Sequence, residues 1–341
     1  MKIFIYSHTH WDREWYLSQI QFQTRLVRTI DEIIELIEAA DGFAVFVLDG
    51  QTCVIQDYLE LRPEREADIR RLIGGGKLAI GPWYSMPDDF LADGEALIRN
   101  LVRGQADCRE YGAPYPNVGY VPDSFGHIEQ LPQLLRGVGI DNFAFGRGRP
   151  ATMAISDGHR LEFFWQAPDG SRVLALHMPE AYGSARYLPG VDQPEALRKR
   201  FEAIIATFAN SHCPDLALAA HGIDHTWLQR DIAAILRELP RLMPEVSFHH
   251  GTLEDALAAW KAELPAGLEV WEGQLRGRLR IDELHGTLSS RIDNKAWNAR
   301  AAIYIEDLAE PLDAIAGRFG KCSAQPFLRK AWELICQNHA H

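Results

Sequence analysis

The sequence alternates short apolar runs with segments of helical periodicity almost from end to end. The apolar runs predict strands at residues 3–6, 44–48, 78–80, 118–121, 143–145, 163–165, 173–177, 216–220 and 246–248. Helical patterns lie around 26–37 and at 64–73, 94–111, 130–138, 194–209, 226–239 and 253–262. Strands separated by helix-length crossovers pair in parallel, so the chain is predicted to be α/β. With about seven such units, a closed or nearly closed seven-stranded parallel β/α barrel is favoured over an open sheet.

The character of the sequence changes after about residue 280. Residues 288–316 and 327–338 are predicted to be helical, and no strand is predicted between them. We therefore expect a catalytic β/α barrel domain over residues 1–280. Residues 281–341 are expected to form the first helices of an incomplete α-helical domain.

Charge and cysteine content limit the partners and the compartment. The formal net charge of -12 disfavours nucleic acid and anionic membranes as main partners, because both would repel the chain. No stretch approaches the roughly 20 apolar residues of a membrane span, and the first residues do not form a signal peptide. The five cysteines are scattered and form no C-x-x-C pair, which is typical of a reducing compartment. The expected location is the cytoplasm, and a homo-oligomer remains open.

The first motif with chemical potential follows the first predicted strand, at residues 7–15. Alternate residues of an extended chain share a face, so His8, His10 and Asp12 can present imidazole and carboxylate groups to one cation. Zinc accepts these ligands and needs about four of them from distant segments. Local capping of a helix is the alternative role for these residues. Trp15 is either a stacking platform for a sugar or a core residue.

Two further acidic residues follow apolar strands. Asp123 precedes a turn of small residues, where a barrel would display a catalytic carboxylate, although an N-cap role is also common for aspartate. Asp224 lies in a loop between His221 and His225 and is the natural second carboxyl group for glycosidic bond cleavage. The two histidines are either metal ligands or ordinary loop residues. We expect the Asp88-Asp89 pair to form a solvated acidic turn.

Taken together, these motifs resemble glycoside hydrolase family 38, the α-mannosidases, and in particular the bacterial branch that includes mannosylglycerate hydrolases. The resemblance is carried in order along the whole chain by residues 8–16 (HTHWDREWY), 48–52 (LDGQT), 80–84 (IGPWY), 122–126 (PDSFG), 288–291 (LSSR), 331–334 (AWEL) and 337–341 (QNHAH). No single motif is sufficient, but the ordered set is specific.

The resemblance implies roles for individual residues. The zinc ligands of the family fall on His10, Asp12, Asp123 and His341, and Asp123 is also the nucleophile. The general acid falls on Asp224. Residues expected to contact the substrate or the nucleophile are Trp15, Phe125 and Arg147. The family's segment around the last ligand continues beyond His341, so the chain is expected to be truncated at its C-terminal end.

The implied reaction is a zinc-dependent, retaining hydrolysis of an α-mannoside through a glycosyl-aspartate intermediate. Retention requires the carboxyl groups of Asp123 and Asp224 to lie about 5–5.5 Å apart. Two other interpretations stay open. A metal-dependent carbohydrate deacetylase would use metal-bound water as its nucleophile. A sugar-binding domain, inactive because of the truncation, would bind mannose without turnover.

Overall fold

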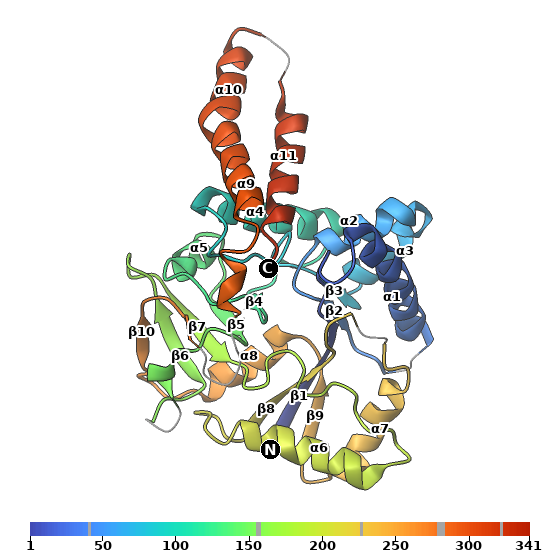
Figure 1. Ribbon diagram of the computed structural model, residues 1–341. Coiled ribbons are helices and arrows are strands. Elements are labelled where there is room, and N and C mark those ends of the chain that lie inside the picture. The colour runs from blue at the N-terminus through green and yellow to red at the C-terminus, as the bar shows by residue number, and fades with distance from the viewer. Residues whose placement is uncertain (40–41, 155–157, 226–227, 278–283, 321–322) are drawn as a thin grey trace.

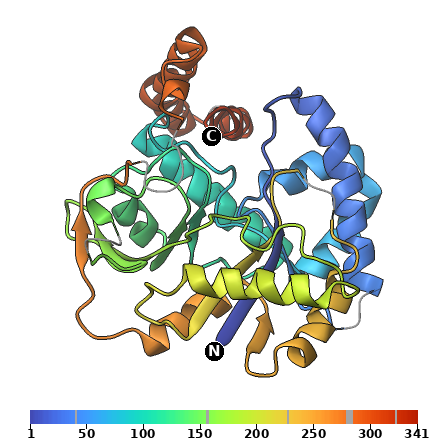
Figure 2. The ribbon, with the colours of Figure 1, turned by 60° about the horizontal axis from the view of Figure 1, so that its bottom comes forward.

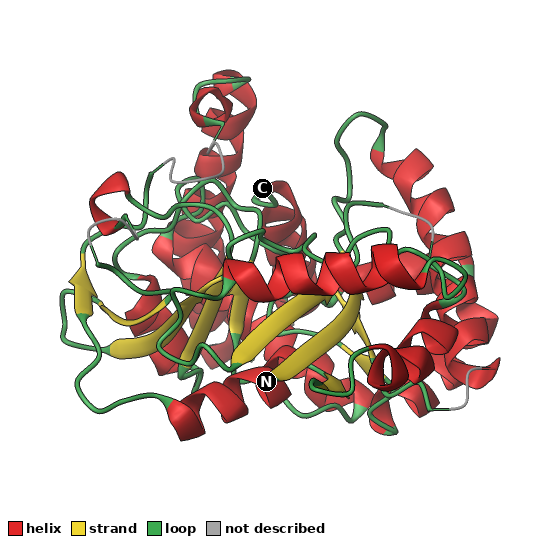
Figure 3. Ribbon diagram, turned by 90° about the horizontal axis from the view of Figure 1, so that it is seen from below, coloured by secondary structure: helices red, strands yellow, loops and turns green. Residues whose placement is uncertain are grey.

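The computed structural model describes residues 1–39, 42–154, 158–225, 228–277, 284–320 and 323–341. Its strands form two five-stranded sheets with helices packed around them (Figures 1 and 3). The α/β class is therefore confirmed. The predicted closed or nearly closed barrel of seven parallel strands is not found, because no ladder between described residues joins the two sheets and one sheet is mixed.

The first sheet is parallel and is built around a central strand. β1 (Lys2–Thr9) pairs with β8 (Leu216–His221) along one edge. Its other edge pairs with β9 (Ser247–His250) and then with β2 (Phe46–Leu48), and β2 pairs with β3 (Leu78–Ala79). Because both edges of β1 are paired and Ile3 and Ile5 are fully buried, this strand forms the middle of the core.

The second sheet has the order β10-β6-β7-β5-β4 and is mixed. Its strands are β4 (Gly119–Val121), β5 (Asn142–Phe145), β6 (Glu162–Gln166), β7 (Arg172–His177) and β10 (Val270–Glu272). β6 and β7 are antiparallel. Residues 167–171 between them are too few for a parallel crossover, which needs a dozen residues or more, so the chain turns back as a hairpin.

The gap between the two sheets is spanned by a side chain. Trp83, after β3, donates from Nε1 to the carbonyl oxygen of Tyr120 in β4 (3.1 Å). The indole thus takes a carbonyl that a neighbouring strand of a closed barrel would otherwise use. The spacing of apolar residues in the sequence does not show whether two strands are joined by a side-chain contact of this kind or by a ladder of backbone hydrogen bonds.

Helices surround both sheets (Figure 2). They are α1 (Gln19–Ala39), α2 (Cys53–Leu61), α3 (Glu66–Gly74), α4 (Gly94–Tyr111), α5 (Leu131–Gly137), α6 (Pro194–Thr207), α7 (Ile232–Leu242) and α8 (Leu253–Glu263). The helix predicted from residue 226 begins at Ile232, and residues 226–227 lie outside the described part of the chain. α2 and β10 were not predicted. None of the described helices is both long and apolar enough to cross a membrane.

The last three helices project away from the sheets (Figure 1). α9 (Ile292–Tyr304) continues through a π-helical stretch (Ile305–Ala309) into α10 (Glu310–Arg318), and α11 (Gln325–Asn338) returns beside them. A small apolar cluster separate from the main core joins them to α4; it consists of Ala96, Ala302, Trp332 and Ile335. The predicted domain boundary between residues 280 and 281 lies outside the described residues.

Candidate active site

Four strand or helix ends converge at one place. His10 and Asp12 follow β1, Asp123 follows β4, Asp224 follows β8, and His341 follows α11. Two groups of side chains there have ligand atoms within 4.8 Å of one another: His10, Asp12 and His341, and His10, Asp123 and Asp224. The residues predicted to bind metal and to carry out catalysis therefore lie together in space.

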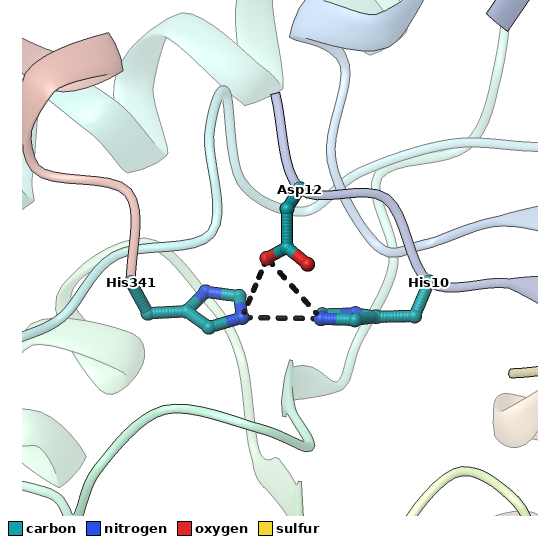
Figure 4. A group of neighbouring side chains, drawn as sticks. All are labelled: His10, Asp12 and His341. Carbon is teal, nitrogen blue, oxygen red and sulfur yellow. Dashed lines mark hydrogen bonds and ion pairs between the residues drawn. The ribbon is translucent and has the colours of Figure 1, made fainter. Parts of the chain in front are cut away.

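The imidazoles of His10 and His341 lie side by side in this site (Figure 4). Nε2 of His10 lies 3.1 Å from Nε2 of His341. Oδ1 of Asp12 lies 3.6 Å from the first nitrogen and 3.5 Å from the second. Oδ2 of Asp123 lies 3.7 Å from His10 Nε2 and 4.0 Å from His341 Nε2. All these atoms face a common centre.

His10 is fixed by a network behind it. Its Nδ1 donates to Oδ1 of Asp49 (2.9 Å), because a carboxylate accepts. Oδ2 of Asp49 accepts from the backbone N–H of Trp11 (2.7 Å) and from Nε2 of Gln51 (2.8 Å). With Nδ1 committed to Asp49, the Nε2 lone pair of His10 points into the site.

His341 is held in the corresponding tautomer by the backbone. Its Nδ1 lies 3.3 Å from the carbonyl oxygen of Met86, which can only accept, so Nε2 again carries the lone pair. Two imidazole lone pairs at 3.1 Å repel each other unless a cation or a proton lies between them. Two ligands of a tetrahedral zinc ion with bonds of about 2.0–2.1 Å lie roughly 3.3 Å apart. The donor set therefore fits zinc.

The electrostatics of the site also suit a cation. Burial alone would lower the pKa of His10, but the carboxylates of Asp49, Asp12 and Asp123 raise this pKa well above its ordinary value. The arrangement thus concentrates negative charge around a fully buried imidazole. A positive charge placed among these groups would be stabilised.

Asp123 is oriented from two sides. Arg147 donates from Nε to Oδ1 of Asp123, while Oδ2 faces the histidine pair. The Arg147 guanidinium also lies 5.9 Å from the ring centre of Phe125, and the Phe125 ring lies 6.2 Å from the ring of His341. Arg147 and Phe125, both predicted to serve the site, therefore border it.

Asp224 faces the site from the end of β8, the strand next to β1. Its Oδ1 accepts from the hydroxyl of Tyr182 (2.8 Å) and lies 3.9 Å from His10 Nε2. Burial raises the pKa of Asp224. Burial and the charges of Asp123 and Asp224 raise the pKa of Tyr182, so its hydroxyl stays protonated and donates. One oxygen of Asp123 and one of Asp224 are within 4.8 Å of each other.

Other histidines named by the sequence have different surroundings. His8 lies on the same face of β1 as His10, but its Nε2 donates to the carbonyl of Tyr182 (2.8 Å). His221 lies 3.1 Å from Ser7 Oγ through Nδ1, and His225 Nε2 accepts from the backbone N–H of Asp12 (3.0 Å). His8, His221 and His225 thus support the site from outside the two ligand groups.

Two expectations about exposure had different outcomes. Trp15 is 67% exposed and its ring lies 6.2 Å from that of His225, so it stands at the rim of the site and is not a core residue.

The prediction of a solvated turn at Asp88-Asp89 is wrong, since these side chains are 1% and 2% exposed. Backbone N–H groups of Phe90 and Ile128 donate to them, which accounts for burial of part of each carboxylate.

Sequence reasoning missed two residues that hold the site together. Asp49 directly follows an apolar strand, which is the signal that also marks Asp123. Tyr182 lies in a loop without periodicity or a flanking strand. Its contact with Asp224 joins residues 42 positions apart and has no local sequence signal.

Comparison with known protein families gives a decisive match. The family described as "Glycosyl hydrolases family 38 N-terminal domain" matches residues 1–274. The chain belongs to glycosyl hydrolase family 38. All the residues of the site except His341 lie within the matched range.

Individual family members are similar over very different lengths. A protein of Halalkalibacterium halodurans named "Putative mannosylglycerate hydrolase" is 35% identical over 99% of this family 38 chain and 38% of its own length. "Alpha-mannosidase 2C1" of Mus musculus is 34% identical over 52% of the chain and 17% of its own length. The crystal structure of an alpha-mannosidase from Enterococcus faecalis V583 superposes with a TM-score of 0.92 and 34% identity, covering 100% of the chain and 38% of that protein. The chain thus spans well under half the length of these relatives.

Proposed function

We propose that this family 38 chain forms the catalytic core of a zinc-dependent retaining α-mannosidase. The observation that carries the proposal is the convergence of the His10 and His341 imidazoles with the carboxylates of Asp12 and Asp123 at the β1 end. A third carboxyl group, that of Asp224, lies beside them and is held separately by Tyr182. The similarity to proteins named α-mannosidases supports the choice of sugar.

His10, Asp12, Asp123 and His341 would hold the metal ion. Zinc bound there would act as a Lewis acid and grip substrate hydroxyls. In the proposed reaction, a carboxylate oxygen of Asp123 attacks the anomeric carbon and forms a glycosyl ester. Arg147, bonded to one oxygen of Asp123, fixes the direction of that attack.

Asp224 is the proposed general acid and base. It protonates the leaving oxygen in the first step and takes a proton from water in the second step. Burial raises its pKa, which favours the protonated form that the first step needs. Tyr182 is a positioning residue, since its hydroxyl bonds one oxygen of Asp224 and leaves the other for proton transfer.

The spacing of the two acids supports retention. Retaining enzymes have carboxyl groups about 5–5.5 Å apart, whereas inverting enzymes need about 6.5–9.5 Å to admit a water molecule. Oxygens of Asp123 and Asp224 lie within 4.8 Å, close to the first class.

The test combines metal analysis with turnover of p-nitrophenyl α-mannoside. We expect about one zinc ion per chain, loss of activity on chelation, and α-mannose as the first-formed anomer by proton NMR. A fluorinated mannosyl donor should label Asp123 in the wild type and leave D123N unlabelled. A β-anomeric product would sink the retaining mechanism, and release of acetate from acetylated sugars without mannoside turnover would favour a deacetylase.

We also propose a cytoplasmic location. The four cysteines in the described part of the chain, Cys53, Cys108, Cys213 and Cys336, are buried and free of disulfide bonds. Free buried thiols are typical of proteins in a reducing compartment. The proposal predicts no disulfide formation in the protein isolated from its native cells without added reductant.

A further inference from the structure

Two segments that the sequence singled out, residues 48–52 and 80–84, supply no member of the two ligand groups. The first begins at the end of β2 and the second follows β3, so they leave adjacent parallel strands at the same edge of the first sheet. They also stay in contact, because Gln51 and Trp83 form a parallel bridge. What these segments do for the site is shown by the side chain of Gln51.

Gln51 is 2% exposed, and both ends of its amide are hydrogen-bonded. Nε2 donates to the carbonyl oxygen of Trp11 (2.8 Å) and to Oδ2 of Asp49 (2.8 Å). Oε1 accepts from the backbone N–H of Met86 (3.1 Å) and from the thiol of Cys53 (3.4 Å). A carbonyl and a carboxylate accept and a backbone N–H donates, so these partners fix which end of the amide faces which way.

The donor end of the amide holds one half of the metal site. Trp11 stands in the chain between the proposed ligands His10 and Asp12, and Asp49 bonds Nδ1 of His10 (2.9 Å). Through these two partners, Gln51 fixes the backbone between two ligands and the carboxylate behind one of them.

The acceptor end holds the other half. The carbonyl oxygen of Met86 lies 3.3 Å from Nδ1 of His341 and accepts from the backbone N–H of His341, also at 3.3 Å. The same segment bonds the end of α11 again, since the backbone N–H of Asp88 donates to the carbonyl of His339 (2.8 Å). Gln51 therefore bonds the N–H of the residue whose carbonyl holds the last ligand.

A continuous hydrogen-bonded path thus joins the two imidazoles behind the site. It runs from His10 to Asp49, from Asp49 to Gln51, from Gln51 to Met86 and from Met86 to His341. In front, the two Nε2 atoms lie 3.1 Å apart (Figure 4). Two nitrogen ligands of one zinc ion lie roughly 3.3 Å apart, so the two segments must keep their relative position closely.

The chemistry of this place demands a glutamine. One buried side chain must donate twice at one end and accept at the other, which the amide group does. An ionised glutamate has no donor for Asp49 or Trp11, and a methionine of similar length offers neither donor nor strong acceptor. Either change leaves buried polar groups without partners.

We propose that Gln51 is a positioning residue that joins the two halves of the metal site, so that His10 and His341 meet the ion as one pre-positioned pair. This inference rests on the metal site of the proposed function. Without the link, part of the binding free energy of the ion would be used to bring the end of α11 into register with the end of β1.

The first test is a double-mutant cycle on zinc affinity, measured by competition with a zinc-binding dye. Q51M keeps the length of the side chain and removes its hydrogen bonds, and should weaken zinc binding about 30-fold. In an H341A background there is no second half to join, so the same change should cost only about threefold, a non-additivity typical of residues in one hydrogen-bond network. Q51E, which keeps the volume and the oxygen facing Met86, repeats the cycle with a smaller packing change.

Q23M is the matched control for loss of a buried amide. Gln23 on α1 is 5% exposed, and its Nε2 likewise donates to a backbone carbonyl, that of Asp57 (2.8 Å), and to a carboxylate, that of Glu60 (3.0 Å). These partners lie outside the two ligand groups. Q23M should lower the free energy of unfolding as Q51M does, but should leave zinc affinity within about twofold.

A second measurement requires neither zinc nor turnover. In the metal-free chain, Q51M should raise hydrogen exchange about fivefold at the backbone N–H groups of both Met86 and Asp88. Gln51 bonds the first group directly, and the second bonds the end of α11, which loosens when the link is lost. Q23M should leave both exchange rates unchanged.

The outcomes separate this inference from the proposed function. An equal loss of affinity from Q51M in both backgrounds, an equal loss in Q23M, or faster exchange at Met86 alone would overturn the joining role of Gln51. Absence of zinc binding would remove the proposed metal site, and the exchange rates would still decide whether Gln51 joins the two segments. The expected cycle without hydrolysis of p-nitrophenyl α-mannoside would count against the proposed function alone.

Discussion

His10 and His341 contribute equivalent nitrogen atoms to the site, but the two regions that carry them are built differently. His10 follows β1, the central strand of the first sheet, and the carboxylate of Asp49 fixes its ring from behind. A backbone N–H and an amide side chain hold that carboxylate in turn. His341 follows α11, which packs on α4 through a small cluster separate from the main core and contributes Cys336 to the main core. It is held by a backbone carbonyl.

This difference separates two ways of preparing a metal site. On the β1 side, the geometry of the imidazole comes from side chains and from the stability of the core. On the α11 side, the geometry comes from the docking of a helix. We therefore expect perturbations of the two regions to affect metal affinity and folding stability in different proportions.

Removal of either histidine should have the largest effect. H10A and H341A should each weaken zinc binding by more than about 100-fold, because each removes a ligand instead of a supporting partner. Only H10A should also destabilise the metal-free chain, by about 1–3 kcal/mol, because it removes the hydrogen-bond donor of the buried Asp49 Oδ1. Chelator competition and urea unfolding measure the two quantities. Equal destabilisation by both variants would contradict the comparison.

The α11 side should be sensitive to packing far from the metal. W332A removes a nearly buried side chain that also donates to Glu310 (2.9 Å), and should destabilise the docking of α11 by about 3 kcal/mol. Hydrogen exchange should rise in α11 while β1 stays protected, and zinc affinity should fall with it. W297A, which changes a 66% exposed tryptophan on α9, is the matched control. Uniform exchange throughout the chain would show that α11 does not open separately.

Variants of the groups behind the two histidines should show whether a side chain or the backbone fixes each imidazole ring. D49N should weaken zinc binding about 10- to 100-fold, because the partner of a ligating histidine sets its tautomer and basicity. M86L should leave the affinity within about twofold, since His341 is held by the carbonyl of that residue. Competition with a zinc-binding dye measures both. An equal loss in M86L would mean that the Met86 side chain, and not its carbonyl, orders the site.

His221, at the end of β8, should make the free energy of unfolding depend on pH. Burial lowers the pKa of His221 from 6.5 to about 4. Between these values the unfolded chain binds a proton that the folded chain does not. The stability that this group contributes is fully present above pH 6.5 and is lost as the pH falls toward 4. In urea titrations of the metal-free chain, H221Q should reduce the slope of unfolding free energy against pH by up to about 1.4 kcal/mol per pH unit. Unchanged slopes would show that His221 does not bind the extra proton on unfolding.

The sequence predicted the places of catalytic groups better than the arrangement of strands. His10, Asp123 and Asp224 each follow an apolar run, and apolar runs reliably mark buried strands. The closed barrel failed because closure depends on contacts such as that of Trp83 with Tyr120, between residues 37 positions apart. Tyr182 could not be assigned for a related reason. The loop around it is shaped by a hydrogen bond from Ala185 to Ala220 in β8 and by the left-handed residues Ala181 and Tyr187, and neither feature has a periodic pattern.

The meeting of His10 and His341 has a topological consequence. The two residues are 331 positions apart, so an ion bound between them would close nearly the whole chain into a single ring. Such a ring behaves as a reversible cross-link that reduces the entropy of the unfolded chain, and long rings gain the most from closure. A bound metal ion would then cross-link the segment after β1 to the segment after α11. Its release would open this cross-link from the α11 end.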